Sequence, residues 1–160
     1  MSGAIQRWNA TAVKGRTRDA LARGMQAAIE YLVAEVSESI SVGYPPASEP
    51  GEPPHLRTGT LRGSIIGGVI TPDENTVIGR FGVQKGPAEK YGRALELGYV
   101  GAVFVMGYDA RSALGTPYSV PSHIRMMNLH ERPFLRPALS ANREGIVALL
   151  IGATSLTPGV

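Results

Sequence analysis

The sequence predicts an α+β fold: a long N-terminal helix, a small, mainly antiparallel β-sheet with a short helix, and a C-terminal helix packed on the sheet. Three observations support it. Apolar residues recur at three- and four-residue steps over residues 8–41, as on one face of a helix. Two β-branched runs flank a Pro-Asp-Glu-Asn turn, and a second helical pattern lies near the C-terminus. A chain of 160 residues fits one domain spanning 1–160.

The first helix is expected over residues 8–41, and Trp8, Ala12 and Val13 could extend its apolar side upstream. Gly43 and the two prolines after Tyr44 end it. Its stripe is expected to contact the core or another subunit. The stripe consists of Leu21, Met25, Ile29 (or Ala28), Leu32, Val36 and Ile40.

Charge is distributed unevenly along the chain, although the net charge is only +3. Residues 1–24 are strongly basic, whereas residues 25–56 contain five glutamates and no lysine or arginine. The basic start could contact nucleic acid or an acidic partner, or it could be a solvated helix face. The absence of cysteine excludes disulfides and cysteine metal sites. No apolar run reaches membrane-spanning length, so we expect a soluble protein without a membrane partner.

Residues 43–57 form a Pro/Gly-rich arm that we expect to be extended and exposed. The sheet and a short helix follow over residues 58–108. Thr58 is expected to cap a single helical turn, with Gly59 allowing the tight entry and Leu61 pointing inward. Two strands, 65–71 and 76–84, then form a hairpin. Its strands contain Gly67, Gly68, Gly79 and Gly82, which indicate bulges or close backbone approach.

The short helix starts near Pro87 and ends at Gly98, with Tyr91, Ala94 and Leu95 on its apolar side. A strand-like run up to residue 108 follows it. Residues 109–131 lack periodicity and are expected to form a long loop. The C-terminal helix is expected over 132–151. Residues 152–160 are small and polar, which predicts a tail.

No constellation in the sequence indicates catalysis, so we expect a protein that is not an enzyme and has no catalytic residues, metal site or cofactor. His55, His123 and His130 lack metal-ligand spacing. There is no G-x-S-x-G elbow, and Glu89 and Glu96 have no second group across a cleft. The glycines match neither a Walker loop nor a dinucleotide fingerprint.

Three segments, in this order, resemble a known family: LRTGTLRGSI (56–65), YGRALELG (91–98) and RPFLRPAL (132–139). They resemble the head–tail joining or tail-completion (neck, or tail-component) proteins of long-tailed bacteriophages. The chain departs from the family at Leu97, where an aromatic residue is usual, and at Tyr99, where Thr or Ser is common. Its gap before Arg132 is also longer. The matching structural positions are Thr58, Gly59, Leu61, Ser64, Ile65, Tyr91, Gly98, Pro133, Phe134, Leu135 and Pro137.

The resemblance implies a structural protein of the virion rather than an enzyme. Such a protein forms a homo-oligomeric ring, a hexamer or dodecamer, in the phage neck, and DNA passes through its lumen without sequence-specific contact. Its neighbours would be other neck proteins, a head adaptor, and a tail-terminator or tail-tube protein. It would be located in the neck or tail of the virion, and in the host cytoplasm during assembly.

Five charged residues of the three segments are the candidate interface with a subunit or partner: Arg57, Arg62, Glu96, Arg132 and Arg136. The arginines could pair with carboxylates of a neighbour such as Glu96, or one of them could pair with Glu96 within the chain. Pro133 and Pro137 most simply fix the turn into the last helix, and Phe134 and Leu135 fill the core. The alternatives to a ring subunit are a DNA-binding module that uses the basic helix and, least favoured, an enzyme with a cryptic site.

Overall fold

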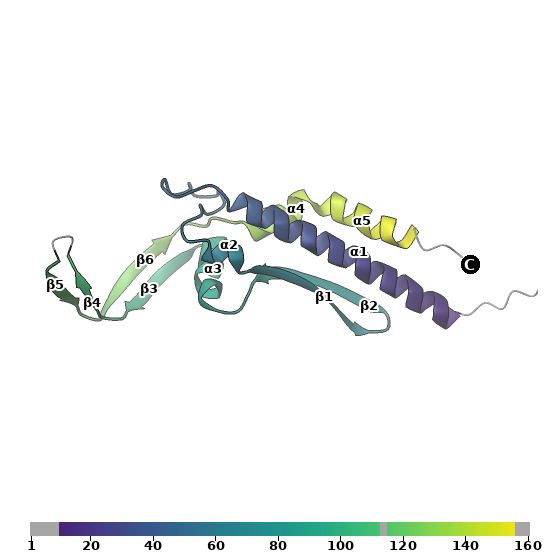
Figure 1. Ribbon diagram of the computed structural model, residues 1–160, viewed down its shortest axis with the longest axis horizontal. Coiled ribbons are helices and arrows are strands. Elements are labelled where there is room, and N and C mark those ends of the chain that lie inside the picture. Colours follow the sequence, from purple (N-terminus) through teal and green to yellow (C-terminus); the bar gives the residue numbers. More distant parts are fainter. Residues whose placement is uncertain (1–9, 113–114, 156–160) are drawn as a thin grey trace, which may run out of the picture.

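The computed structural model describes residues 10–112 and 115–155 (Figure 1). In chain order the elements are α1 (Ala10–Ser39), α2 (Thr60–Gly63), β1 (Ile65–Asp73), β2 (Thr76–Val83), α3 (Pro87–Leu97), β3 (Tyr99–Val105), β4 (Tyr108–Arg111), β5 (Pro117–Val120), β6 (His123–Leu129), α4 (Leu135–Ala141) and α5 (Arg143–Ser155). The α+β class with a long first helix and antiparallel strand pairs is as predicted. The strands form three two-stranded sheets rather than one small sheet.

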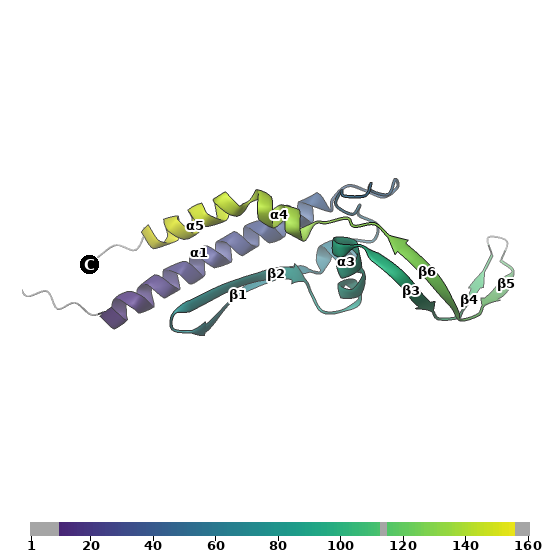
Figure 2. The ribbon, with the colours of Figure 1, turned by 180° about the vertical axis from the view of Figure 1, so that it is seen from behind.

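Helix α1 lies between two layers, with the β1–β2 hairpin along one side and α4 and α5 along the other (Figures 1 and 2). The expectation that the C-terminal helix packs on the sheet is therefore wrong, because α1 occupies that position. A helix between two layers needs two apolar faces. The predicted stripe supplies the first. The second consists of small residues, because Gly24 contacts α5 and Ala20 and Ala28 lie one turn to either side.

The β1–β2 hairpin forms as predicted, with antiparallel pairing from Ile65↔Val83 to Asp73↔Thr76. The Asp73 carboxylate closes its turn by accepting hydrogen bonds from the Asn75 backbone N–H at 2.7 Å and the Thr76 hydroxyl at 2.8 Å. These bonds, the one from Asn75 foremost, lower the pKa of Asp73. Pro72 and the Asx-type turn at Asp73 thus form the hairpin turn that the sequence predicted at residues 72–75.

Two of the four hairpin glycines let α1 approach the hairpin closely. A Cβ at Gly67 would lie 2.2 Å from Ile29 Cγ2, and one at Gly79 would lie 2.6 Å from Met25 Sδ. This is the close backbone approach that glycine in a strand indicates. Gly68 and Gly82 lie on the opposite face, where an added Cβ would meet nothing within 4 Å.

The arm 43–57 is mostly exposed, as expected, but it is not extended. It folds back on itself, since Tyr44 N–H donates to Leu56 O at 3.0 Å and Leu56 N–H donates to Val42 O at 2.6 Å. A parallel bridge joins Gly43 to Leu56. The arm is therefore a closed loop that returns the chain to the core before α2.

The expectation of a long loop over 109–131 is wrong. Strand β6 pairs antiparallel with β3 from Tyr99↔Leu129 to Val105↔His123, and β4 pairs with β5 beyond them. The resulting β3–β6 ribbon extends from the body with β4–β5 at its far end (Figure 1). Within residues 10–112 and 115–155, no helix packs substantially on either face of β6, so its sequence lacks the alternation of a half-buried strand.

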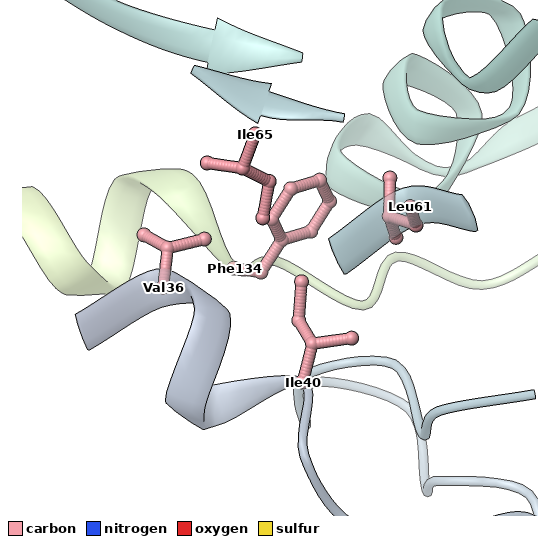
Figure 3. Packing of buried hydrophobic residues seen from close by; sticks show 5 residues of the cluster. All are labelled: Val36, Ile40, Leu61, Ile65 and Phe134. Carbon is pink, nitrogen blue, oxygen red and sulfur yellow. The ribbon is translucent and has the colours of Figure 1, made fainter. Parts of the chain in front are cut away.

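The C-terminal helix is interrupted at Asn142, giving α4 and α5 instead of the single helix predicted over 132–151, and it continues to Ser155. Residues 152–155 of the predicted tail are therefore helical, and residues 156–160 lie outside the described residues, as does Trp8. The core gathers side chains from four segments (Figure 3). Its fully or nearly buried members are Val36, Ile40, Leu61, Ile65 and Phe134. Leu135 packs against this cluster and is partly buried.

Candidate functional site

Glu96 caps helix α4 from a distant part of the chain. Its side chain is buried, and its carboxylate accepts hydrogen bonds from three consecutive backbone N–H groups. These are Phe134 N–H at 2.8 Å, Leu135 N–H at 3.0 Å and Arg136 N–H at 3.0 Å. The first four N–H groups of a helix have no partner within it. Glu96 satisfies three of them and places a negative charge at the positive end of the helix.

Pro137 accounts for the fourth group, because proline has no N–H to satisfy. The RPFLRP segment thus presents three consecutive backbone N–H donors, followed by a proline that has no N–H. Arg136 closes the arrangement from outside, since its Nε donates to Glu96 Oε1 at 3.1 Å and its Nη2 donates to Glu96 O at 2.6 Å. Nη2 also donates to Glu131 Oε2 at 3.1 Å. We call Glu96, Arg136, Pro137 and the three N–H groups the Glu96 node.

The node keeps Glu96 ionised. Burial would raise its pKa, but the hydrogen bonds from Phe134, Leu135 and Arg136, together with the Arg136 guanidinium, outweigh burial and lower it from its ordinary value of 4.5. A buried carboxylate held in this way is a structural group. It has no free lone pair directed at a substrate cavity, so the node offers packing and orientation rather than acid–base chemistry.

Of the two pairing modes that the sequence left open for Glu96, the structure shows the one within the chain, with Arg136. The third segment is held in place by further bonds. Arg132 N–H donates to Leu95 O at 2.6 Å, and Arg132 Nε donates to Ser48 O of the arm at 3.1 Å. Gly98, with φ of 72°, ends α3 beside these residues. Two of the three sequence segments thus meet directly.

The start of α2 differs from the prediction. The residue at the N-cap position is Gly59, with φ of 76°, and no side chain caps the helix. The Thr58 hydroxyl lies 3.0 Å from that of Thr60 and 3.5 Å from Thr60 N. A residue with a Cβ rarely adopts the φ of Gly59, so glycine is needed here for the entry that was predicted. Ser64 closes the turn by donating to Leu61 O at 2.7 Å.

A cleft of about 530 Å³ lies between the arm, α2 and α3. Its apolar wall includes Ile40, Leu56 and Leu95, and Tyr91 lines it from α3. Three of the four candidate arginines also line it. No aspartate or glutamate does. We call this feature the arginine cleft; its cationic lining is Arg57, Arg62 and Arg132, with His55.

Arg57 and Arg62 differ from Arg136 in their contacts. The Arg57 guanidinium carbon lies 5.5 Å from the centroid of the Tyr44 ring, a cation–π distance. Within the described parts of the chain, neither Arg57 nor Arg62 forms an ion pair. Both side chains belong to exposed residues, so their charges are available to a carboxylate from outside the chain.

Sequence reasoning missed Ser48, Glu131 and the role of the arm. Ser48 is buried and its carbonyl accepts from Arg132, while Gly51 N–H donates to Glu131 O at 2.9 Å. The acidic Glu131 directly before RPFLRP was the available signal for a second partner of Arg136. No local pattern indicated that the proline-rich arm returns to this segment.

Comparisons with protein-family models, with curated proteins and with solved structures found no match to this chain. Among the residues that the structure describes, no helix is long and apolar enough to cross a membrane. The same residues contain no group of three or more His, Asp or Glu that could hold a metal ion. Function must therefore be argued from the surfaces and from the resemblance of the three sequence segments.

Proposed function

We propose that this protein is a structural subunit of a homo-oligomeric ring in the neck of a long-tailed phage. The observation that carries the assembly part is the apolar β3–β6 ribbon. Its two strands pair with each other and pack substantially on no other described helix or strand. A two-stranded hairpin alone is at best marginally stable in water. A ribbon of this kind is therefore expected to gain its stability from a partner.

The total surface of the chain supports the same proposal. It exposes 11729 Å², whereas a compact monomer of 16.9 kDa exposes about 7,700 Å². Allowing roughly 2,500 Å² for the residues that the structure does not describe, 1–9, 113–114 and 156–160, leaves an excess of about 1,500 Å². Two standard interfaces, each burying about 800 Å² per partner, would remove an amount of this order.

The placement in a phage neck rests on the three sequence segments. In the structure they support one another: Glu96 of the second caps the helix of the third, and Leu61 and Ile65 of the first pack with Phe134 of the third. Because residues of the three segments contact one another in the folded chain, there is a physical reason for the three segments to occur together. Arg57 and Arg62, with no carboxylate partner in the described chain, remain the proposed contacts to a neighbouring subunit or neck protein.

The test is to measure mass by size-exclusion chromatography with light scattering, to image the particles by negative stain, and to locate the protein in purified virions with an antibody. We expect concentration-dependent ring-shaped oligomers and a signal at the head–tail junction. A protein that stays monomeric under all conditions and is absent from virions would contradict the proposal. Binding to duplex DNA at low salt, lost as salt rises, in a chain absent from virions would favour the DNA-binding alternative.

A further inference from the structure

One face of the β3–β6 ribbon is largely apolar and largely exposed. Cross-strand partners share a face, so Phe104 and Ile124 lie together, as do Ala102 and Met126, and Val100 lies beside them opposite Asn128. The four large side chains are between 65% and 76% exposed. Contiguous exposed apolar side chains of this size mark interaction surfaces. We call the five residues the ribbon face: Val100, Ala102, Phe104, Ile124 and Met126.

A second apolar surface lies on the opposite part of the molecule, on the side of β1–β2 that faces away from α1. Ile66 and Ile70, 49% and 43% exposed, flank Gly68 on this side. Their cross-strand partners are Gly82, Arg80 and Ile78. The surface carries a shallow hollow of about 440 Å³ that no residue of α1 lines. We call it the hairpin face: Ile66, Gly68, Ile70, Ile78, Arg80 and Gly82.

Glycine at positions 68 and 82 is unexplained by the chain itself. Gly67 and Gly79 face α1, which would collide with a side chain, but a Cβ at Gly68 or Gly82 would meet nothing. Neither Gly68 nor Gly82 has the positive φ that favours glycine. Glycine weakens a strand and commonly marks the close approach of another chain. Among the residues that the structure describes, none approaches Gly68 or Gly82 on this face.

The two faces are similar in length and in the pattern of their side-chain sizes. Each spans about 13 Å along its strand, from Val100 to Phe104 and from Ile66 to Ile70, at about 3.3 Å per residue. On β3 and on β1 a small residue, Ala102 or Gly68, lies between two larger ones, as facing layers need in order to interdigitate. The ribbon face carries no charge, and the hairpin face carries one, Arg80, which pairs with Gly68 at the middle of the face.

We propose that the ribbon face of one copy packs on the hairpin face of the next copy. This inference rests on the proposed ring and identifies its contact. Because the two faces differ and lie on different parts of the molecule, the contact is head-to-tail. Such a contact generates a closed ring when the rotation closes. The excess surface of the chain is of the size that one ribbon face and one hairpin face, each with its surroundings, would bury.

The decisive experiment uses two variants, F104D on the ribbon face and I70D on the hairpin face, with mass measured by light scattering. Each variant alone should lose assembly, with association weakened at least about 100-fold. Mixed in equal amounts they should form heterodimers and nothing larger, because I70D keeps an intact ribbon face and F104D an intact hairpin face. Assembly of either variant alone, or a mixture that stays monomeric, would overturn the inference.

Three further variants control for folding and for the choice of surface. G68V and G82V fill open space, so they should keep the unfolding midpoint of the wild type within a few degrees and still lose assembly. V147D changes an exposed apolar residue of α5 and should assemble as the wild type does. Assembly by both valine variants, or loss of assembly in V147D alone, would overturn the inference.

The outcome separates this inference from the proposed function. If wild-type rings form and F104D forms them equally well, the contact is wrong and the ring proposal stands. If the wild type shows no self-association up to about millimolar concentration, well above ordinary interface affinities, the contact is wrong. The virion location then decides the ring proposal separately.

Discussion

Glu96 supplies at one position what most helices obtain from several small capping groups. A local Ser or Asp at the N-cap satisfies one or two N–H groups, whereas this carboxylate satisfies three from 38 to 40 residues away in sequence. The cap therefore also joins α3 to α4. Loss of the side chain disconnects two elements and leaves donors unpaired, which costs more than a missing local cap.

We expect E96A to destabilise the fold by about 3–5 kcal/mol, because it leaves three buried or partly buried backbone N–H groups and Arg136 Nε without their acceptor. The free energy of unfolding, from urea titration followed by circular dichroism, measures it. The matched control is E89Q, on the exposed side of the same helix, with an expected effect below about 1 kcal/mol. An E96A effect as small as that of E89Q would show that the node is not a stabilising element.

The same residue makes a pH-dependent contribution. Its pKa is lowered in the folded protein, so its contribution to stability is fully present above the unfolded value near 4.5 and is lost as the pH falls through the folded value. The difference in unfolding free energy between wild type and E96Q should be constant from pH 7 to 5 and shrink below pH 4.5. Urea titrations of both proteins at each pH test this, and a difference that grows on acidification would contradict it.

At the scale of single residues, the sequence identified several residues that matter but not all of their roles. A pair within the chain between Glu96 and one of the four arginines was one of the two modes left open, and the inward position of Leu61 and the burial of Phe134 were expected. Capping by a residue distant in sequence leaves no periodic signal, so the link from Glu96 to the N–H groups could not be predicted. The Thr58 cap was expected from residue type, but the positive φ of Gly59 decides the geometry there.

Among the elements, α1 determines the packing because it lies against both other layers. Its two faces require different contact distances. Large side chains such as Ile29 and Leu32 belong to the buried core, while Gly24 lets α5 come so near that an added Cβ would be 2.7 Å from Ala153 Cβ and 3.3 Å from Leu149 O. The second of these atoms is backbone and cannot rotate away.

We therefore expect G24A to destabilise the protein by about 1–3 kcal/mol, although alanine is the better helix former. The matched control is G15A in the same helix, where an added Cβ meets nothing within 4 Å. It should stabilise the protein by up to about 1 kcal/mol. Thermal unfolding by calorimetry distinguishes the two directions. Equal stabilisation by both substitutions would show that α5 does not need the glycine.

The sequence predicted helices and strands well where one face of the element is buried and the other is exposed, and poorly elsewhere. The β1–β2 hairpin and α3 have clear turn residues, glycine and proline at their ends, and a covered face. Neither face of strand β6 is covered by the residues that the structure describes, and residues 109–131 were therefore expected to be a loop. The position of α5 depended on small residues, Ala20 and Gly24, that hydrophobic periodicity does not weigh.

The whole molecule is long and thin, with a packed three-layer end and an unsupported ribbon at the other (Figures 1 and 2). Stability must be correspondingly uneven. The α1 layer has the buried core, whereas β3 and β6 bury little beyond each other. Regions with few buried apolar contacts open at low free energy.

We expect hydrogen exchange to show this difference. In the monomer, amides of α1 near Leu32 and Val36 should be strongly protected, and those of β3 and β6 should exchange fast. On assembly the ribbon amides should slow at least about tenfold, because a partner then covers them. Mass spectrometry of peptic fragments at low and high protein concentration measures both. Strong ribbon protection in the monomer would show that the ribbon needs no partner.

The overall shape was beyond reach from sequence, because it depends on which surfaces the chain leaves uncovered. A prediction built on burial assumes that apolar strands find cover within the chain. Ile124 and Met126 do not, and nothing local to them says so. The resemblance of three segments supplied the expectation of an assembly, and the exposed ribbon gives that expectation a place on the molecule.

The Glu96 node also has a mechanical consequence. Strand β3 begins at Tyr99, directly after Gly98, and β6 ends at Leu129, just before Glu131. Both ends of the ribbon are thus anchored within a few residues of the node. Seven residues of strand make a lever arm of about 23 Å, and the node is its fulcrum. A force on the ribbon tip therefore acts on the node, and Phe134 connects the node directly to the hydrophobic core.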